Sequence, residues 1–241
     1  MRRAAWATYR TNLSEPGTAQ LQVTAPAPSA RLAFVSTRSG NVEIYSMNPD
    51  GSGVAKLTNW PSSLEASPHW PRDGTQLVFL SSRTGSGDIY KMKANGTAPT
   101  RLTTSTQPET NPQRSPTRDE IVFVRDGDLD VMNTAGGAIR RLTNTSPAET
   151  SPSWSPDGNR IAFGVLGQSR GITTIDRTGS GRTRLTTGAD NEPDWSPDGT
   201  KIAFTSNRDG NFEIYRMSST GANRTRLTTS PGPDVGPAWT P

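Results

Sequence analysis

Short stretches in which apolar and polar residues alternate recur along the chain and predict β-strands. Residues 201–205 form a compact apolar run around Phe204, and residues 212–217 alternate apolar and polar side chains around Tyr215. Both patterns are typical of short strands. The segment 196–199, Ser-Pro-Asp-Gly, has Pro and Gly where a tight turn needs them, so it is expected to close a hairpin with the strand before it.

This pattern recurs in five copies, each with a Phe in one predicted strand and a Leu-Thr pair in another. The copies follow one another at intervals of 40 to 45 residues, with Phe at Phe34, Phe79, Phe123, Phe163 and Phe204 and Leu-Thr pairs beginning at Leu57, Leu102, Leu142, Leu185 and Leu227. A period of this length indicates stacked or radial repeats. The full unit holds four strands, named here by their marker residues as the Trp, Phe, Tyr and Leu-Thr strands. Four short antiparallel strands per repeat are typical of a propeller blade.

We therefore expect an all-β propeller of four-stranded antiparallel blades. The expected repeats are 31–66, 67–110, 111–150, 151–191 and 192–234, followed by a closing strand at 235–241, while residues 1–30 form an N-terminal extension or linker. The first repeat lacks a Trp strand, and Trp239 begins one at the other end. If the two termini complete one blade, the ring closes with five blades and no free sheet edge. A six-bladed or truncated propeller is the alternative.

The repeat resembles the WD-like repeat of the TolB family of β-propellers. The likeness is carried by Trp-Ser-Pro-Asp-Gly at 195–199, Ile-Ala-Phe at 202–204, Arg-Asp-Gly-Asn-Phe-Glu-Ile-Tyr at 208–215 and Arg-Leu-Thr at 226–228, and it extends over residues 31–241. It implies a protein-protein interaction module without catalysis, and a periplasmic or extracellular location. It also implies six blades. Similar repeats form propellers of peptidases and oligogalacturonate lyases, so the alternative is an accessory propeller domain of a peptidase or polysaccharide-degrading enzyme.

One acidic residue occupies the same position in every repeat, three residues before the Pro of the Trp strand. These residues are Glu65, Glu109, Glu149, Asp190 and Asp234. The connection into the innermost strand is the same in each blade, so the carboxylates are expected to form a ring at the mouth of the central channel. The middle hairpins on that face carry one Arg per repeat, at Arg38, Arg83, Arg125, Arg170 and Arg208.

Two interpretations of this ring follow. Each carboxylate can pair with an Arg and hold the fold together. Alternatively, unpaired carboxylates focus a negative field at the channel mouth, where a basic peptide segment or a cation would bind. Trp60 lies outside the repeated positions, in the connection after the first Leu-Thr pair, and is either an anchor for a partner or an aromatic residue packed under its loop. The other repeated aromatic residues are expected to form the core between blades.

Residue usage argues against most catalytic and metal sites. The 241 residues include one His, His69, and no Cys, so disulfides, thiolate ligands and Cys nucleophiles are excluded. His69 lies within a repeat and is interpreted as a strand residue. No Gly-x-Ser-x-Gly motif is present, and only the acidic ring offers a carboxylate pair of the kind that glycosidases use. We expect no catalytic residue, no metal site and no cofactor.

The charge distribution argues against nucleic-acid and membrane partners. There are 26 Lys and Arg residues against 22 Asp and Glu, and the basic residues are spread over the repeats, notably before the Leu-Thr pairs. We interpret them as a solvated outer rim rather than the clustered basic stripe of a nucleic-acid-binding protein. No apolar run reaches the length of a membrane span, and residues 1–30 show no signal peptide. The expected partner is a protein or peptide, bound by a monomer.

Overall fold

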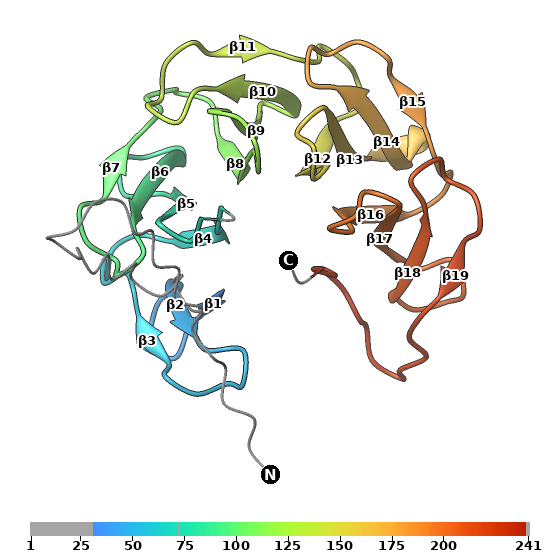
Figure 1. Cartoon of the computed structure of the whole chain (residues 1–241). Coiled ribbons are helices and arrows are strands. Elements are labelled where there is room, and N and C mark those ends of the chain that lie inside the picture. The colour runs from blue at the N-terminus through green and yellow to red at the C-terminus, as the bar shows by residue number, and fades with distance from the viewer. Residues whose placement is uncertain (1–30, 72, 240–241) are drawn as a thin grey trace, which may run out of the picture.

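The computed structural model describes residues 31–71 and 73–239, which form five antiparallel β-sheets arranged around a central axis (Figure 1). The first sheet contains β1 (Leu32–Ser36), β2 (Glu43–Met47) and β3 (Ala55–Lys56). The second contains β4 (Glu65–His69), β5 (Gln76–Ser81), β6 (Asp88–Lys93) and β7 (Thr100–Arg101), and the third β8 (Glu109–Arg114), β9 (Ile121–Arg125), β10 (Asp128–Met132) and β11 (Arg140–Arg141). The fourth contains β12 (Glu149–Trp154), β13 (Arg160–Val165), β14 (Gly171–Asp176) and β15 (Thr183–Arg184), and the fifth β16 (Asp190–Trp195), β17 (Lys201–Ser206), β18 (Glu213–Ser218) and β19 (Thr225–Arg226).

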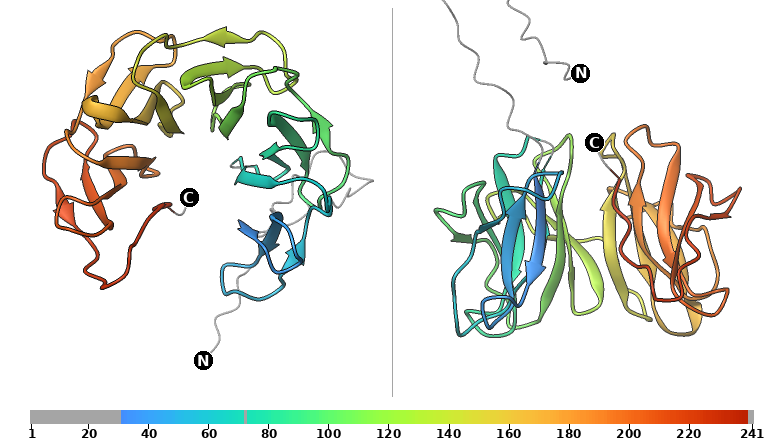
Figure 2. Two further views of the ribbon diagram at one scale, coloured as in Figure 1. Left: turned by 180° about the vertical axis from the view of Figure 1, so that it is seen from behind. Right: turned by 90° about the horizontal axis from the view of Figure 1, so that it is seen from below.

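This arrangement confirms the predicted five-bladed, all-β propeller. In each four-stranded blade the strands are adjacent in chain order, with the first strand innermost and the Leu-Thr strand at the outer rim (Figures 1 and 2). One short 3-10 helix, η1 (Gly167–Ser169), interrupts the hairpin between β13 and β14. The blades stand edge-on around the axis, so the hairpins and connections of all five gather on two opposite faces.

The core lies between neighbouring blades. In the junction of the fourth and fifth blades, Ile172 and Leu185 on one side pack against Trp195, Phe204 and Tyr215 on the other. The repeated Phe side chains at 79, 123, 163 and 204 are 0% exposed. The repeated aromatic residues therefore form the core between blades, as predicted from their spacing.

A β-bulge shapes each of the four innermost strands. The register with the next strand shifts within β4, β8, β12 and β16, and the residue before the strand's Pro has a positive φ of 49° to 52°. Proline is tolerated at a bulge because no ladder hydrogen bond is needed from its nitrogen. The bulge extends pairing to the acidic residue, so the repeated carboxylate begins the strand.

The two ends of the described chain do not join in the expected way. Within residues 31–239, β1 pairs only with β2, and residues 235–239 form no strand. Instead, the Trp239 amide donates to Asp194 at 2.7 Å and the Gly236 amide donates to Glu192 at 2.9 Å, both on β16. These bonds hold the segment against the fifth blade, and Figure 1 shows it running inward at the opposite end of the arc from β1.

Candidate functional site

The candidate site is the loop face, defined here as the face formed by the hairpins between the second and third strands and by the connections into the innermost strands. The carboxylates of Glu65, Glu109, Glu149 and Asp190 begin β4, β8, β12 and β16 at this face. Each of these residues is at most 3% exposed. Burying four carboxylates requires compensation by hydrogen bonds or positive charge.

In two blades the compensating charge is the predicted hairpin Arg. Arg208 donates to both oxygens of Asp190 at 2.9 and 2.8 Å, and the Arg125 Nε lies 3.1 Å from Glu109. Each guanidinium also lies over the Phe of its own blade, 5.4 Å from the Phe204 ring centroid in the fifth blade. The Arg therefore contacts both the carboxylate at the start of the strand and the aromatic core. This favours the interpretation that these ion pairs hold the fold together.

In the fourth blade a different Arg takes this position. Glu149 accepts hydrogen bonds from Arg182 at 2.6 Å and from Thr145 at 2.9 Å, and also from the Thr143 hydroxyl. Arg182 comes from the turn before β15, and its guanidinium lies 5.1 Å from the Phe163 centroid. The predicted Arg170 is exposed and donates to the Gly167 carbonyl, because η1 reshapes the hairpin that carries it.

In the second blade the carboxylate is compensated by hydroxyl groups. Glu65 accepts from Ser63 at 2.6 Å and from Ser81 at 2.9 Å. Burial raises the pKa of Glu65, opposed by these hydroxyls and by the charge of Arg83. The Arg83 guanidinium stacks on Trp60, 3.7 Å from its centroid. The half-buried Trp60 ring in turn stacks on Phe79, so Trp60 packs in the junction between the first two blades.

Two predicted site residues lie apart, at the two ends of the arc. Arg38 lies over Phe34 and Tyr45, 5.1 and 4.8 Å from their centroids, and donates to Ser36 at 3.0 Å. Asp234 is placed by a hydrogen bond from its amide to the Phe212 carbonyl. No ion pair within residues 31–71 and 73–239 links these two residues, so the structure does not bring them together.

A second set of buried carboxylates lies on the same face and was missed in the sequence. They begin β2, β6, β10 and β18, which occupy the Tyr-strand position of four blades. Each pairs with the basic residue before the Leu-Thr pair: Glu43 with Lys56 at 3.3 Å, Asp88 with Arg101 at 2.9 Å, Asp128 with Arg141 at 3.1 Å and Glu213 with Arg226 at 2.8 Å. These four basic residues lie on the outer rim with side chains 28% to 42% exposed, as predicted, but each also pairs with a buried carboxylate, which was not predicted. The sequence signal that could have predicted these ion pairs is an acidic residue at the start of the Tyr strand together with a basic residue before the Leu-Thr pair of the same repeat.

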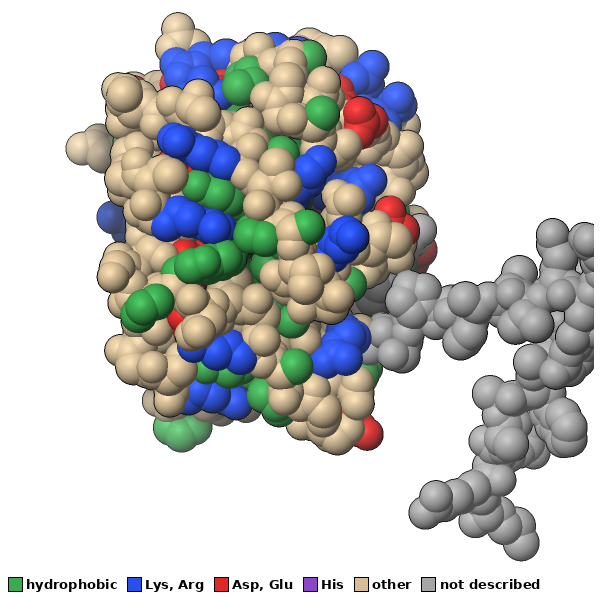
Figure 3. Space-filling model, turned by 90° about the vertical axis from the view of Figure 1, so that its left-hand side faces the viewer, with side chains coloured by type: hydrophobic (Ala, Val, Ile, Leu, Met, Phe, Trp, Pro, Cys, Tyr) green, Lys and Arg blue, Asp and Glu red, His purple; other side chains and the backbone are tan. Residues whose placement is uncertain are grey.

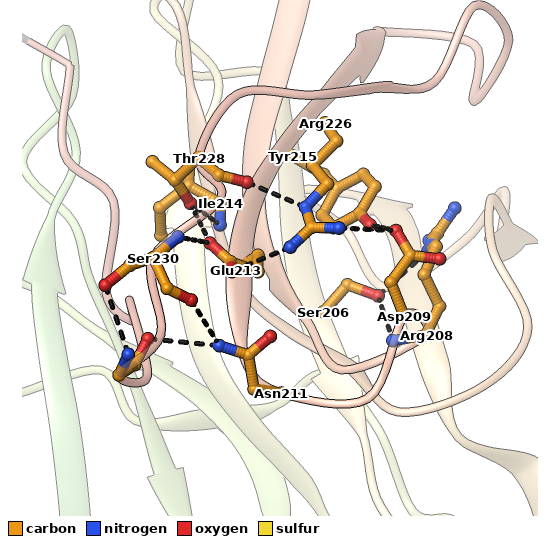
Figure 4. Close-up of polar contacts among 11 residues, drawn as sticks. Ser206, Arg208, Asp209, Asn211, Glu213, Ile214, Tyr215, Arg226, Thr228 and Ser230 are labelled. Carbon is orange, nitrogen blue, oxygen red and sulfur yellow. Dashed lines mark hydrogen bonds and ion pairs between the residues drawn. The ribbon is translucent and has the colours of Figure 1, made fainter.

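The fifth blade shows how this network is built (Figure 4). The Thr228 hydroxyl donates to Glu213 at 2.5 Å and accepts from the Ile214 amide at 2.9 Å, while Arg226 donates to Glu213 from the other side. The Thr228 hydroxyl and the Arg226 guanidinium lower the pKa of Glu213 to about 2. The same amide-to-Thr bond occurs in all five blades, which explains the repeated Thr.

His69 is a half-buried strand residue at a blade junction. Its Nδ1 accepts a hydrogen bond from the Arg114 amide in the next blade at 3.3 Å. In the following junction the Gln113 side chain accepts from the Trp154 amide in the same way, at 2.5 Å. Burial and the nearby Arg114 charge lower the pKa of His69 to about 4. His69 is therefore neutral at physiological pH.

This pKa predicts a pH-dependent stability. The unfolded chain binds a proton at His69 near pH 6.5, whereas the folded protein binds it only near pH 4, so the native state loses stability as the pH falls between these values. We expect His69→Gln, which keeps the acceptor, to reduce this loss. Unfolding midpoints of both proteins at pH 7.5, 6, 5 and 4 would measure it. Parallel curves for the two proteins would contradict the assignment.

Other chemistry finds little support in the described part of the chain. No group of three or more His, Cys, Asp or Glu side chains is placed there to hold a metal ion. Among the same residues, no helix has the length and apolar character needed to cross a membrane. Figure 3 shows Lys and Arg scattered among apolar and neutral side chains over the outer side of the first blades, without one continuous basic patch.

Comparison with known proteins agrees with this geometry. The family model of the TolB β-propeller domain matches residues 14–130. The fold is similar to TolB from Acinetobacter baumannii, with a TM-score of 0.77 and 22% identity, and to a putative TolB from Agrobacterium tumefaciens, with a TM-score of 0.69 and 26% identity. The chain is a β-propeller whose fold is similar to that of TolB. The family match includes residues 14–30, which precede β1 and lie outside the described residues.

The TolB likeness covers 86% of this chain but 54% of the Acinetobacter structure, so the chain spans about half the length of that relative. For the Agrobacterium structure the shares are 78% and 70%. An oligogalacturonate lyase in complex with manganese is a more distant match, with a TM-score of 0.55 and 14% identity over 83% of this chain and 74% of the lyase. The search of curated proteins found no match.

Proposed function

We propose that this TolB-like propeller is a non-catalytic interaction module that binds a protein or peptide segment on its loop face. The observation that carries the proposal is the separation of charge on that face. The Arg side chains at 101, 141, 182, 208 and 226 are 30% to 42% exposed, whereas their partners Asp88, Asp128, Glu149, Asp190 and Glu213 are at most 9% exposed. The exception is Asp209, a second partner of Arg226, which is 47% exposed. The loop face therefore presents guanidinium groups and hides most of the carboxylates that pair with them.

This separation favours a partner segment with acidic side chains. Guanidinium groups bind carboxylates in a fixed planar geometry, and those stacked on aromatic rings are already oriented. Arg38 and Arg170 are exposed and form no ion pair in the described structure. A basic segment would instead have to displace an Arg from a buried carboxylate. The proposed partner is therefore an acidic peptide segment rather than the basic one suggested by the sequence.

The absence of catalysis is part of the proposal. It is supported by the neutral, half-buried His69 and by the engagement of the loop-face carboxylates with Arg and hydroxyl groups. A periplasmic or extracellular location is also proposed, on the basis of the TolB likeness. The second candidate is an accessory propeller domain of a peptidase or polysaccharide-degrading enzyme, which the likeness to an oligogalacturonate lyase favours. If the gene encodes a catalytic domain in the same reading frame as this propeller, the second candidate function is correct.

Binding of charged peptides tests the proposal. We expect a flexible peptide rich in Asp and Glu to bind, its Asn and Gln counterpart to bind more weakly, and binding to weaken as salt is added. The double variant Arg38→Glu and Arg170→Glu should lower the affinity on the order of tenfold. Fluorescence anisotropy of labelled peptides would measure both effects.

The matched control is the double variant Lys93→Glu and Lys201→Glu, which makes the same charge change at the ends of β6 and β17 that lie away from the loop face. It should leave the affinity nearly unchanged. Equal losses of affinity in the control and in the Arg38 and Arg170 variant would mean that the net charge of the protein, and not the loop face, determines binding. Preference for a Lys-rich peptide over the acidic one would contradict the proposed partner class.

A further inference from the structure

The turn after the first strand of the third blade differs from its counterparts. In the fourth and fifth blades a Trp ends the strand and the turn reads Ser-Pro-Asp-Gly, whereas residues 114–118 read Arg-Ser-Pro-Thr-Arg. Arg114 thus replaces the Trp, Thr117 the Asp and Arg118 the Gly. The Gly of the other two turns has a positive φ, 67° and 69°, and its amide donates to the Ser carbonyl at 2.8 Å. Among the residues that the structure describes, Arg118 shows neither feature, so the turn of the third blade is more open.

The same change leaves the Ser115 hydroxyl unused. In the fourth and fifth blades the corresponding Ser hydroxyl donates to the Asp two residues later, at 2.5 and 2.6 Å. Thr117 stands at the place of that Asp and donates instead to the Asp157 carbonyl of the next blade at 3.0 Å. Ser115 is 4% exposed, and its hydroxyl has no hydrogen-bond partner among the described residues. A buried hydroxyl without a partner costs free energy, so the stability of the blade alone does not explain this turn.

A pocket of about 310 Å³ lies between this turn and the corresponding turn of the second blade. In the next two junctions the turns pack closely: a Cβ added at Gly199 would lie 3.2 Å from Pro156, and one added at Gly158 would overlap the Thr117 hydroxyl. Arg118 occupies the position of this Gly, so a side chain stands where the other blades approach each other most closely. Among the residues that line the pocket are Pro71, Asp73, Arg114, Ser115, Arg118 and Asp119.

Arg114 gives this pocket a guanidinium group with unused donors. Its side chain is 23% exposed, and within residues 31–71 and 73–239 it forms one long ion pair, 3.5 Å from Nη1 to Oδ2 of Asp73, and no hydrogen bond. Asp73 is 49% exposed and already accepts from the Thr75 amide at 2.9 Å and the Thr75 hydroxyl at 2.8 Å. A guanidinium group can bind a carboxylate through two parallel hydrogen bonds. Arg114 therefore has these two bonds to offer to a ligand.

We propose that this pocket binds a small molecule that carries both a carboxylate and an amine, of the size of an amino acid or a dipeptide. Arg114 binds the carboxylate, and Asp73 and the exposed Asp119, which line the same pocket, bind the amine. These two carboxylates disfavour a ligand with a net negative charge, such as phosphate. The volume lies at the lower end of the range for small-molecule sites. The pocket lies on the face opposite the loop face, so the proposal does not depend on the peptide partner proposed above.

His69 provides a direct readout of the pocket by NMR. Its Nδ1 accepts from the Arg114 amide at 3.3 Å, and it is the one His of the chain, so its imidazole signals are assigned without ambiguity in protein without a purification tag. With glycylglycine as the probe, we expect a saturable shift of the His69 signals and of the Arg114 amide. N-acetylglycine lacks the amine and glycinamide lacks the carboxylate, so each should bind more weakly, on the order of tenfold.

The pKa of His69 gives a second measurement on the same samples. Burial and the charge of Arg114 lower this pKa, and a carboxylate bound to Arg114 offsets the second of these causes. Saturation with glycylglycine should therefore raise the pKa of His69, as followed by its imidazole shifts between pH 7 and pH 4. Glycinamide at the same concentration should leave it unchanged.

Substitution of Arg114 locates the binding. Arg114→Met removes the guanidinium group, keeps an unbranched side chain and should abolish the saturable shift. Arg216→Met, at an exposed Arg of β18 in the fifth blade, is the matched control and should bind glycylglycine like the natural chain. Asp119→Asn should bring the affinity for glycylglycine down toward that for N-acetylglycine. Unfolding midpoints would confirm that the three variants fold.

Three results would overturn the proposal. The first is the lack of a saturable shift at His69 and Arg114 with glycylglycine. The second is an equal loss of binding in the Arg114→Met and Arg216→Met variants. The third is tighter binding of inorganic phosphate than of glycylglycine, which would make the pocket an anion site without a role for its carboxylates.

Discussion

Gly96→Ala is expected to destabilise the protein by about 2–5 kcal/mol. Gly96 lies in the turn between β6 and β7 with a φ of +82°, and a Cβ at this position would lie 2.4 Å from the Leu57 carbonyl oxygen of the preceding blade. That oxygen belongs to the backbone, so it cannot move as the end of a flexible side chain could. Relief of the clash requires the two blades to separate, which exposes the core between them.

Gly51→Ala is the matched control for this prediction. Gly51 lies in the corresponding turn of the first blade with the same φ of +82°, but a Cβ added there would have nothing within 4 Å, because no other blade of the described residues packs on this turn. Its loss should be only the left-handed backbone cost, about 1–2 kcal/mol. Denaturant unfolding midpoints would compare the two variants. Equal losses would mean that the turn alone, and not the contact between blades, requires the glycine.

Much of the fold could be predicted because the same strand and turn signals recur in each repeat. Phe204 and Tyr215 alternate with polar residues at a period of two, and this places them on one side of a blade whatever the neighbouring blade contains. Ser-Pro-Asp-Gly at 196–199 defines a hairpin locally, and its Gly199 has the positive φ, 69°, that such a turn needs. Recurrence of these local signals at a fixed period leaves few arrangements other than a propeller.

The details that were not predicted depend on contacts between segments distant in sequence. Glu192 takes a positive φ of 52° before its Pro, which no local preference of Glu favours; the bulge exists because pairing with β17 continues on both sides of it. Likewise, Arg182 replaces Arg170 at Glu149 because a turn one strand away brings it there. The separation of β1 from residues 235–239 depends on the angles between blades, and the repeat length does not encode those angles.

The face on which the candidate site lies could be predicted from the sequence. The burial and pairing of its charged side chains could not. The repeated carboxylates do lie at one face, beside Arg side chains from the middle hairpins. Their burial could not be read from Glu149 or Asp190 alone, because acidic residues are usually exposed and only the surrounding Thr and Arg groups make burial tolerable. Of the two interpretations, the ion pairs of Glu109, Glu149 and Asp190 with Arg favour the structural one.

The second large effect is expected at the buried carboxylates, where Glu149→Gln should cost about 2–3 kcal/mol. Glu149 accepts hydrogen bonds from Arg182, Thr143 and Thr145 and is fully buried as a side chain. A Gln amide keeps one acceptor but turns a donor toward one of these three donors and leaves Arg182 without its counter-charge. The loss stays below that of a fully buried pair because the Arg182 side chain is 37% exposed and can be solvated.

Glu65→Gln is the matched comparison and should cost less than about 1 kcal/mol. Glu65 has no ion pair in the described structure, and its Oε2 has no hydrogen-bond partner there. Burial raises its pKa, so the folded state binds the proton more readily than the unfolded chain and gains stability as the pH falls toward the unfolded value of 4.5. Replacement by neutral Gln removes this burial cost and its pH dependence. A larger loss at Glu65 than at Glu149, in unfolding midpoints measured at pH 7, would show that the unpaired carboxylate rather than the Arg182 pair stabilises the face.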